Sequence, residues 1–226
     1  MKALIIDDNH SFIDLLKNAL QPFRMQIDSF YKFSEARSVL LKNGCYFNQS
    51  IANDILRYHE SVIKSNGQNV PPVPVLDAPF INPDGYGLVF LEYDAEPSMK
   101  GTHFIQDVIK NQKEWSEKNF ILLSGHPEKV EQLAKKMKVA LIEKPIKKDY
   151  MLKMVSEFVQ SIAQKENEIK ELIEKYGIKV KAPDDKKLPL KSKAAPKTKK
   201  GTVKAKKETI KTKKETKPGK GKSASK

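Results

Sequence analysis

The chain has 226 residues, a net charge of +14 and 39% hydrophobic residues, which leaves room for one domain of ordinary size with a segment appended. From Lys179 to Lys226 there are 19 lysines and four acidic residues, so residues 1–178 are close to neutral. A single cysteine, Cys45, excludes an internal disulfide. The sequence has no apolar run long enough to span a membrane and no charged-then-apolar leader, and we expect a cytoplasmic protein.

The first predicted element is a strand over residues 3–6, four apolar residues in a row, which is typical of a parallel sheet covered on both faces. The strand ends at Asp7 and Asp8, and a helix with apolar residues at helical spacing follows over 12–20. Ligands bind at the carboxyl ends of strands in such sheets, and adjacent carboxylates favour a hard cation such as Mg²⁺. The alternative is that the two aspartates cap the helix.

A second strand and helix follow before a proline-rich stretch interrupts the pattern. Residues 25–30 alternate in the manner of an edge strand, and the next helix has Ser34 as its expected N-cap. Residues 44–86 contain helical spacing over 51–63 and then a run of prolines that prevents both helix and central strand. We interpret 44–86 as an insertion on the surface.

Three more buried strands, each followed by a helix, complete the predicted sheet. The strands cover 88–91, 120–123 and 139–142, and the helices cover about 104–109, 128–137 and 148–176. Gly177 is the expected end of the last helix. Strands that alternate with helices predict a doubly wound parallel sheet with helices on both faces.

Each buried strand brings polar side chains to the same edge of this sheet. These side chains are Asp7 and Asp8, Glu92 or Asp94, Ser124, and Lys144. The carboxylates can bind Mg²⁺, whereas the hydroxyl and the ammonium can bind the oxygens of a phosphoryl group. Alone, each residue is also explained as a helix cap, a solvated strand end or a surface charge. Together, in this order, they favour a site.

On these residues the sequence resembles the receiver domains of two-component response regulators. The resemblance covers about 1–43 and 87–160, and it is carried by Ile5-Ile6-Asp7-Asp8, Leu88-Val89-Phe90-Leu91-Glu92 with Pro97 and Gly101, Leu122-Leu123-Ser124-Gly125-His126 and Glu143-Lys144-Pro145. It implies a flavodoxin-like fold with five parallel strands, in which Asp7, Asp8 and Glu92 would bind Mg²⁺. Ser124 would be the switch hydroxyl, and Lys144 would bind the phosphoryl group. The partner of an active member would be a sensor histidine kinase or a phosphotransfer protein.

Three departures from the receiver pattern predict an atypical receiver or pseudo-receiver. Glu92 stands at the phosphoacceptor position in place of aspartate, and its longer carboxylate can pair with Lys144 and imitate the phosphorylated state. The alternative acceptor is Asp94, which lies two residues further on and could project into the same site. Leu141 replaces the aromatic residue expected three positions before the lysine, and the 44–86 insertion lies in a connection that the family keeps short.

The predicted organisation is a receiver-like domain over 1–160, a helical extension over 161–177 and a disordered tail over 178–226. The extension carries a heptad seam, which is interpreted either as the coiled coil of a homodimer or as a helix that packs on the sheet and then frays or folds back. The tail has too few apolar side chains to bury. Its lysines can neutralise the phosphates of a polyanion, and we name Lys199, Lys200, Lys206, Lys207, Lys213 and Lys214.

The function that fits these features is a non-enzymatic signalling protein in a phosphorelay, whose tail binds nucleic acid or another polyanion. One alternative is a nucleic-acid-associated structural protein that uses an inactive receiver fold as an oligomerisation scaffold. Another is a phosphoryl-transfer enzyme that uses the acid pair and Mg²⁺, but the sequence lacks a glycine-rich loop that cradles phosphates. For the tail alone, the plain alternative is a solubilising segment.

Overall fold

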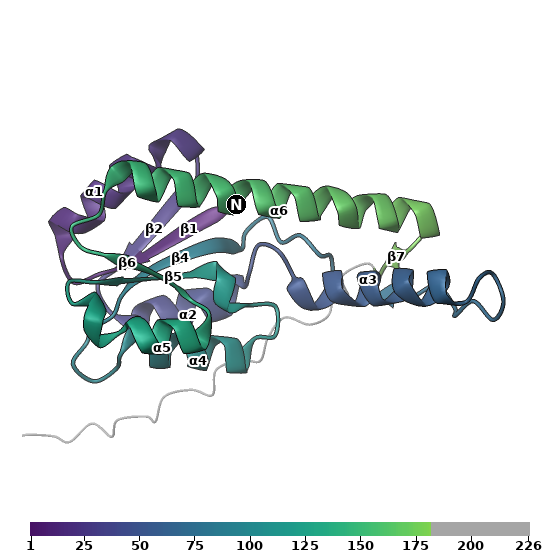
Figure 1. The fold of residues 1–226 in the computed structure, drawn as a ribbon, viewed down its shortest axis with the longest axis horizontal. Helices are drawn as coiled ribbons and strands as arrows, with labels where there is room; N and C mark the ends of the chain where they lie inside the picture. Colours follow the sequence, from purple (N-terminus) through teal and green to yellow (C-terminus); the bar gives the residue numbers. More distant parts are fainter. Residues whose placement is uncertain (182–226) are drawn as a thin grey trace, which may run out of the picture. The chain divides into compact units, whose positions relative to one another are not determined.

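A computed structural model describes residues 1–181, in which five strands form one parallel sheet of order β2-β1-β4-β5-β6 (Figure 1). The strands are β1 Lys2–Ile6, β2 Gln26–Phe30, β4 Tyr86–Glu92, β5 Phe120–Ser124 and β6 Ala140–Glu143. This is the flavodoxin-like order, in which the ligand crevice opens where the strand order reverses, between β1 and β4. The predicted fold class is confirmed.

Helices cover both faces of the sheet. They are α1 His10–Leu20, α2 Phe33–Asn43, α3 Gln49–Lys64, α4 Gly101–Asn111, α5 Glu131–Met137 and α6 Lys148–Tyr176. The first half of α6 lies beside α1 on one face, and α2, α4 and α5 lie on the other (Figure 1). Within β1, Leu4 and Ile6 pack with α2 and α4, whereas Ala3 and Ile5 pack with α1 and α6. Burial on both faces explains the unbroken apolar run.

Two helices begin at other residues than the sequence predicted. Helix α2 begins at Phe33, so Ser34 lies inside it and does not cap it. The backbone N–H of Phe33 donates to Oε2 of Glu96 at 2.9 Å, and this distant carboxylate binds one of the free N–H groups at the start of the helix. Helix α5 begins at Glu131, because a 3-10 turn over Pro127–Lys129 takes up the residues before it.

The 44–86 insertion begins after α2 and ends at the start of β4, and its two ends meet. The N–H of Tyr86 donates to the carbonyl of Gly44 at 3.0 Å, which ties the two ends together. Gly85 lies so close to this junction that a Cβ there would be 2.5 Å from the backbone of Cys45, so only glycine fits. Because its ends are joined, the insertion leaves the order of the strands unchanged.

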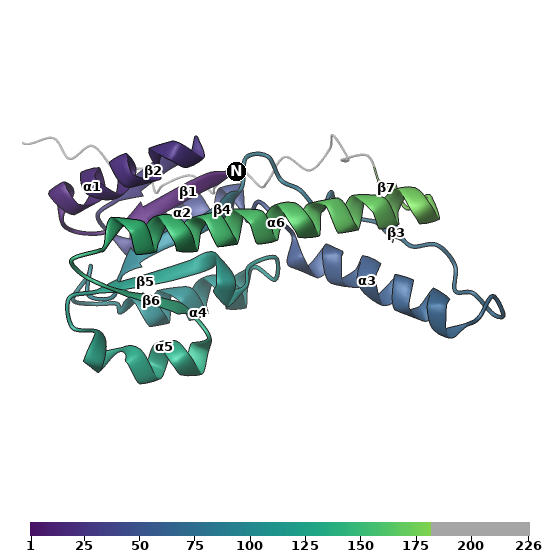
Figure 2. The same ribbon diagram turned by 45° about the horizontal axis from the view of Figure 1, so that its top comes forward.

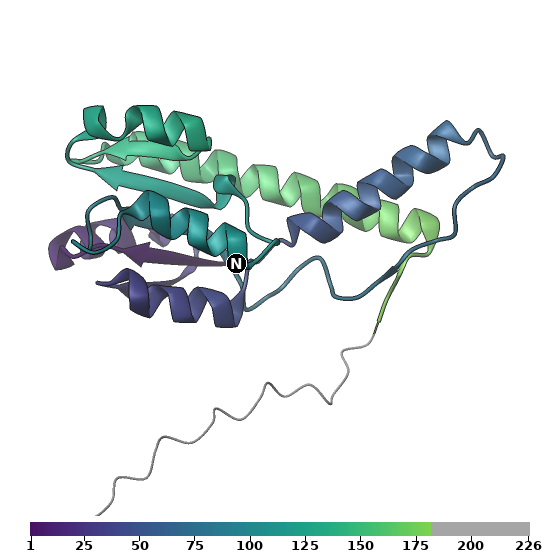
Figure 3. The ribbon, with the colours of Figure 1, turned by 90° about the horizontal axis from the view of Figure 1, so that it is seen from below.

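The insertion and the second half of α6 build a second hydrophobic core, which we call the arm (residues 46–82 and 162–181). Helix α3 packs obliquely across α6 (Figures 2 and 3). The strand β3 (Val75–Leu76) pairs in parallel with β7 (Lys179–Val180). The core of the arm consists of Phe47, Ala52, Ile55, Tyr58, Leu76, Phe80, Ile169, Leu172 and Ile178. The insertion therefore does more than lie on the surface, because it covers the half of α6 that extends past the sheet.

The arm corrects two expectations about the C-terminal part of the chain. The heptad seam of α6 packs on α3 within the same chain, so it no longer supports a coiled-coil homodimer. Residues 178–181 belong to the arm and not to a disordered tail, and all described residues form one compact unit. The rest of the predicted tail, including the six named lysines, lies outside the described residues. Helix α6 ends at Gly177 (φ 61°), as predicted.

Within residues 1–181, no helix combines the length and the apolar character that crossing a membrane requires.

The arm core predicts a stability effect far from the sheet. Ile169 is 1% exposed and packs between α6 and α3, so Ile169→Ala should lower the free energy of unfolding by about 2–4 kcal/mol. Urea unfolding measures the change. The exposed α6 residue Gln164 provides the control, since Gln164→Ala should change stability by less than about 0.5 kcal/mol. Equal stabilities of the two variants would show that α3 does not pack on α6 in solution.

Candidate functional site

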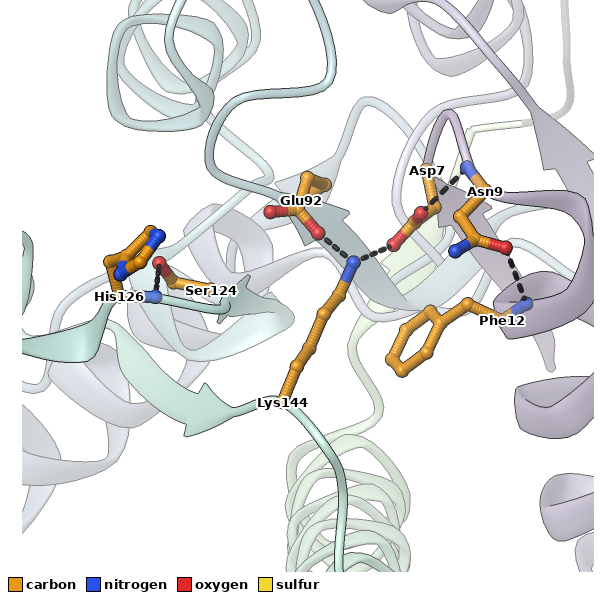
Figure 4. A network of polar contacts seen from close by, with 7 residues as sticks. All are labelled: Asp7, Asn9, Phe12, Glu92, Ser124, His126 and Lys144. Carbon is orange, nitrogen blue, oxygen red and sulfur yellow. Dashed lines mark hydrogen bonds and ion pairs between the residues drawn. The ribbon is translucent and has the colours of Figure 1, made fainter. Parts of the chain in front are cut away.

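The strand register brings two acidic residues together at the carboxyl edge of the sheet. Ile6 of β1 lies opposite Leu91 of β4, so Asp7 and Glu92, one residue further along each strand, leave the sheet side by side. Lys144 follows β6, two strands beyond β4, and its long side chain reaches back across the edge to both acids (Figure 4).

The ammonium of Lys144 lies between the two carboxylates. Its Nζ donates to Oδ2 of Asp7 at 2.7 Å and forms an ion pair with Oε2 of Glu92. It also lies 4.1 Å from the centroid of the Phe12 ring, a cation–π contact. The Asp7 side chain is fully buried, and those of Glu92 and Lys144 are 13% and 19% exposed. We call Asp7, Glu92 and Lys144 the edge triad. Two carboxylates share one ammonium, so the triad carries a net negative charge.

The second oxygen of Asp7 is bound by the start of α1. Its Oδ1 accepts the N–H of Asn9 at 2.9 Å, while Oδ1 of Asn9 accepts the N–H of Phe12 at 3.2 Å and so caps α1. The alternative that Asp7 and Asp8 cap the helix is therefore wrong. Sequence reasoning missed Asn9, although an asparagine just before an apolar periodic segment is a usual N-cap signal.

Ser124 and Asp8, the other predicted site residues, form no hydrogen bond or ion pair with the edge triad among the described residues. Ser124 is buried at the end of β5, and its Oγ accepts the N–H of His126 at 3.0 Å. In Figure 4 this pair stands apart from the contacts of Lys144. Asp8 is exposed, immediately after the buried Asp7.

Asp94 does not face the triad. Strand β4 ends at Glu92, and Asp94 lies in the following turn, where its side chain is 54% exposed and pairs with Lys100. The expectation that Glu92 and Asp94 project into one site is wrong, because it required β4 to continue for two more residues. Of the two candidates for the acceptor position, the structure places Glu92 beside Lys144.

The triad does not fit a magnesium ion in the arrangement described. Among residues 1–181, no three acidic, histidine or cysteine side chains gather closely enough to hold a metal. Two of the predicted ligands, Asp7 and Glu92, already bind the ammonium of Lys144, which takes the place of the cation between them. A divalent ion would have to displace Lys144 before these carboxylates could coordinate it.

Sequence comparisons find no relatives: no protein-family model matches the chain, and no curated protein is significantly similar to it. Some solved structures are similar to parts of the chain. A response regulator receiver domain protein from Clostridium thermocellum has 12% identity and a TM-score of 0.46, over 72% of this chain and 97% of that one. A CheY-like receiver domain from Methylobacillus flagellatus has 16% identity and a TM-score of 0.44, over 70% and 98%.

A third similar structure is the CheY-like receiver domain protein from Methanospirillum hungatei JF-1, with 15% identity and a TM-score of 0.45 over 74% of this chain and 98% of that one. The three similar structures are thus receiver domains. The order of the strands by itself defines the fold of this chain as flavodoxin-like.

The edge triad predicts that Lys144 is needed for stability. Lys144→Met keeps the aliphatic stem but leaves the buried carboxylate of Asp7 unpaired beside Glu92. The free energy of unfolding should therefore fall by about 3 kcal/mol. This is near the lower limit for breaking a buried ion pair, because the ammonium is partly exposed. Thermal and urea unfolding measure the loss. Lys129→Met, at an exposed lysine, is the matched control. Adding Glu92→Gln to Lys144→Met should restore part of the stability; a double variant that is weaker still would contradict the triad.

Proposed function

We propose that the protein is a receiver-type signalling module whose switch site is held in one state by its own side chains. The observation that carries the proposal is the ion pair between Glu92, at the end of β4, and Lys144, which also binds Asp7. In the receiver domains that the sequence resembles, the lysine at this position binds a phosphoryl group on the acceptor residue. Here the carboxylate of Glu92 already provides the negative charge.

A phosphorylatable receiver site takes two charged groups from outside the chain, a phosphoryl group and a divalent ion. A phosphorylated aspartate adds negative charge next to the lysine, and a divalent ion balances the acidic cluster. In this chain the longer Glu92 supplies the charge and Lys144 balances it, so the interaction surface of the domain should not depend on a kinase or on Mg²⁺. The protein then acts as a non-enzymatic binding module, and a histidine kinase or phosphotransfer protein would be a binding partner but not a phosphate donor.

Treatment with a small phosphodonor tests this proposal. The purified protein in Mg²⁺ should form no phosphoryl adduct by intact mass, and beryllofluoride should not shift its unfolding temperature. Glu92→Asp withdraws the carboxylate from Lys144 by one methylene, so this variant should gain an Mg²⁺-dependent adduct and a beryllofluoride shift.

Asp94 provides the control for the same experiment. Asp94→Ala should behave as the unchanged protein does, because Asp94 is exposed and paired with Lys100. An adduct on the unchanged protein that disappears in Asp94→Ala would establish a working switch with a displaced acceptor, and the proposal of a locked site would be wrong.

The lysine-rich C-terminal segment adds a second part to the proposal, namely electrostatic attachment to a polyanion. Nineteen lysines against four acidic residues after position 178 favour contacts with phosphates, which do not depend on base sequence. The alternative of an oligomerisation scaffold is less favoured, because α6 uses its apolar seam within the chain.

Salt-dependent binding to double-stranded DNA and to RNA tests this attachment. Replacing Lys199, Lys200, Lys206, Lys207, Lys213 and Lys214 by glutamine should weaken binding and flatten the dependence of log K on log salt, since each lost phosphate contact lowers the slope by about 0.9. Lys129→Met and Lys153→Met, both outside the segment, should leave the slope unchanged. Equal slopes for all variants would contradict attachment through these lysines and would favour a solubilising segment.

A further inference from the structure

A small hollow lies where the arm meets the sheet domain, beside the start of β5, whereas the edge triad lies at the carboxyl ends of the strands. Its volume is about 40 Å³, and its lining includes Gln49, Ser116, Lys118, Ser161 and Lys165. Lys118 and Ser116 belong to the connection before β5, Ser161 and Lys165 to α6, and Gln49 is the first residue of α3. The hollow is therefore formed by three segments that are distant in the sequence.

The charges at this hollow are of one sign. Among residues 1–181, neither Lys118 nor Lys165 has a carboxylate within ion-pair distance. Burial, and then the positive charge of Lys118, lower the pKa of Lys165, while Glu168 acts weakly in the opposite sense. Two ammonium groups held in the same region without an acidic partner repel each other, and an anion between them would remove that repulsion.

The neutral groups at the hollow also suit an anion. The exposed hydroxyl of Ser161 has no hydrogen-bond partner among the described residues, so it can donate to a ligand. Helix α3 starts at Gln49 with Asn48 as its N-cap and has no acidic residue in its first turn within this described segment, so the positive end of its dipole is not neutralised there. The Oγ of Ser116 is already committed, since it donates to Oδ1 of Asn119 at 3.0 Å.

We propose that this junction hollow binds a tetrahedral oxyanion, phosphate or a terminal phosphate group, between Lys118 of the sheet domain and Lys165 of the arm. The volume of about 40 Å³ is more than the roughly 10–15 Å³ that a cavity needs to hold one water molecule, so a small polyatomic anion has room there. The ligand is thus a free anion or the phosphate end of a molecule that extends into solvent. Because Lys118 lies in the connection before β5 and Lys165 lies in the arm, binding ties the arm to the sheet domain.

A titration with inorganic phosphate at constant ionic strength tests the site in the full-length protein. Trp115 is the single tryptophan of the chain, it is 3% exposed and it directly precedes Ser116 of the hollow, so its fluorescence reports on this place and not on the lysine-rich C-terminal segment. We expect a saturable change in Trp115 emission and a rise in unfolding temperature relative to chloride. The affinity for phosphate that these two measurements give should fall at least tenfold in Lys165→Met and in Lys118→Met.

Lys153→Met is the matched control, because Lys153 is an exposed lysine of the same helix that lies 4.0 Å from Glu157, and it should bind phosphate as the unchanged protein does. Glycerol phosphate separates the two sources of the anion: tighter binding than inorganic phosphate indicates the end group of a larger ligand, and weaker binding indicates the free ion. If neither the fluorescence nor the unfolding temperature depends on Lys165 and Lys118, there is no oxyanion site at the junction and the proposal is wrong.

Discussion

The ammonium of Lys144 is the contact on which the carboxyl edge of the sheet depends. Parallel pairing of β1 with β4 forces Asp7 and Glu92 to emerge next to each other, and Asp7 is completely buried. A buried carboxylate without a partner costs several kcal/mol, and a second one beside it adds repulsion. Lys144 offsets both effects at once, so a side chain of the protein does at this edge what a bound cation does elsewhere.

Helix α6 connects this edge to the rest of the molecule. It begins four residues after Lys144 and packs Met151 and Val155 against the sheet, and its second half packs Ile169 against α3. A helix of 29 residues is about 43 Å long, which is more than the sheet can cover. The insertion supplies the missing partner for the distal part of the helix, so the long helix and the insertion explain each other.

Much of this architecture could be predicted because its causes are local. A strand buried on both faces shows as an apolar run such as residues 3–6, and Gly177 marks the end of α6. The polar residues of the edge could be predicted because parallel strands end at one side. The exclusion of Asp94 from the site could not be predicted, since it depends on the length of β4. Neither could the pairing of α3 with α6, because a heptad seam looks the same whether its partner lies in the same chain or in another.

Lys165 differs from two other lysines of α6, Lys153 and Lys170, in its surroundings. Lys170 donates to Glu166 at 2.7 Å, and Lys153 lies 4.0 Å from Glu157, the spacing at which a helix pairs its own charges. Lys165 has no such partner among the described residues, and it is more buried than either. A surface lysine that lacks a partner loses little, because water solvates it. A half-buried lysine that lines the same hollow as Lys118 has lost part of that solvation. This is the physical reason for expecting an anion at the junction between the sheet domain and the arm.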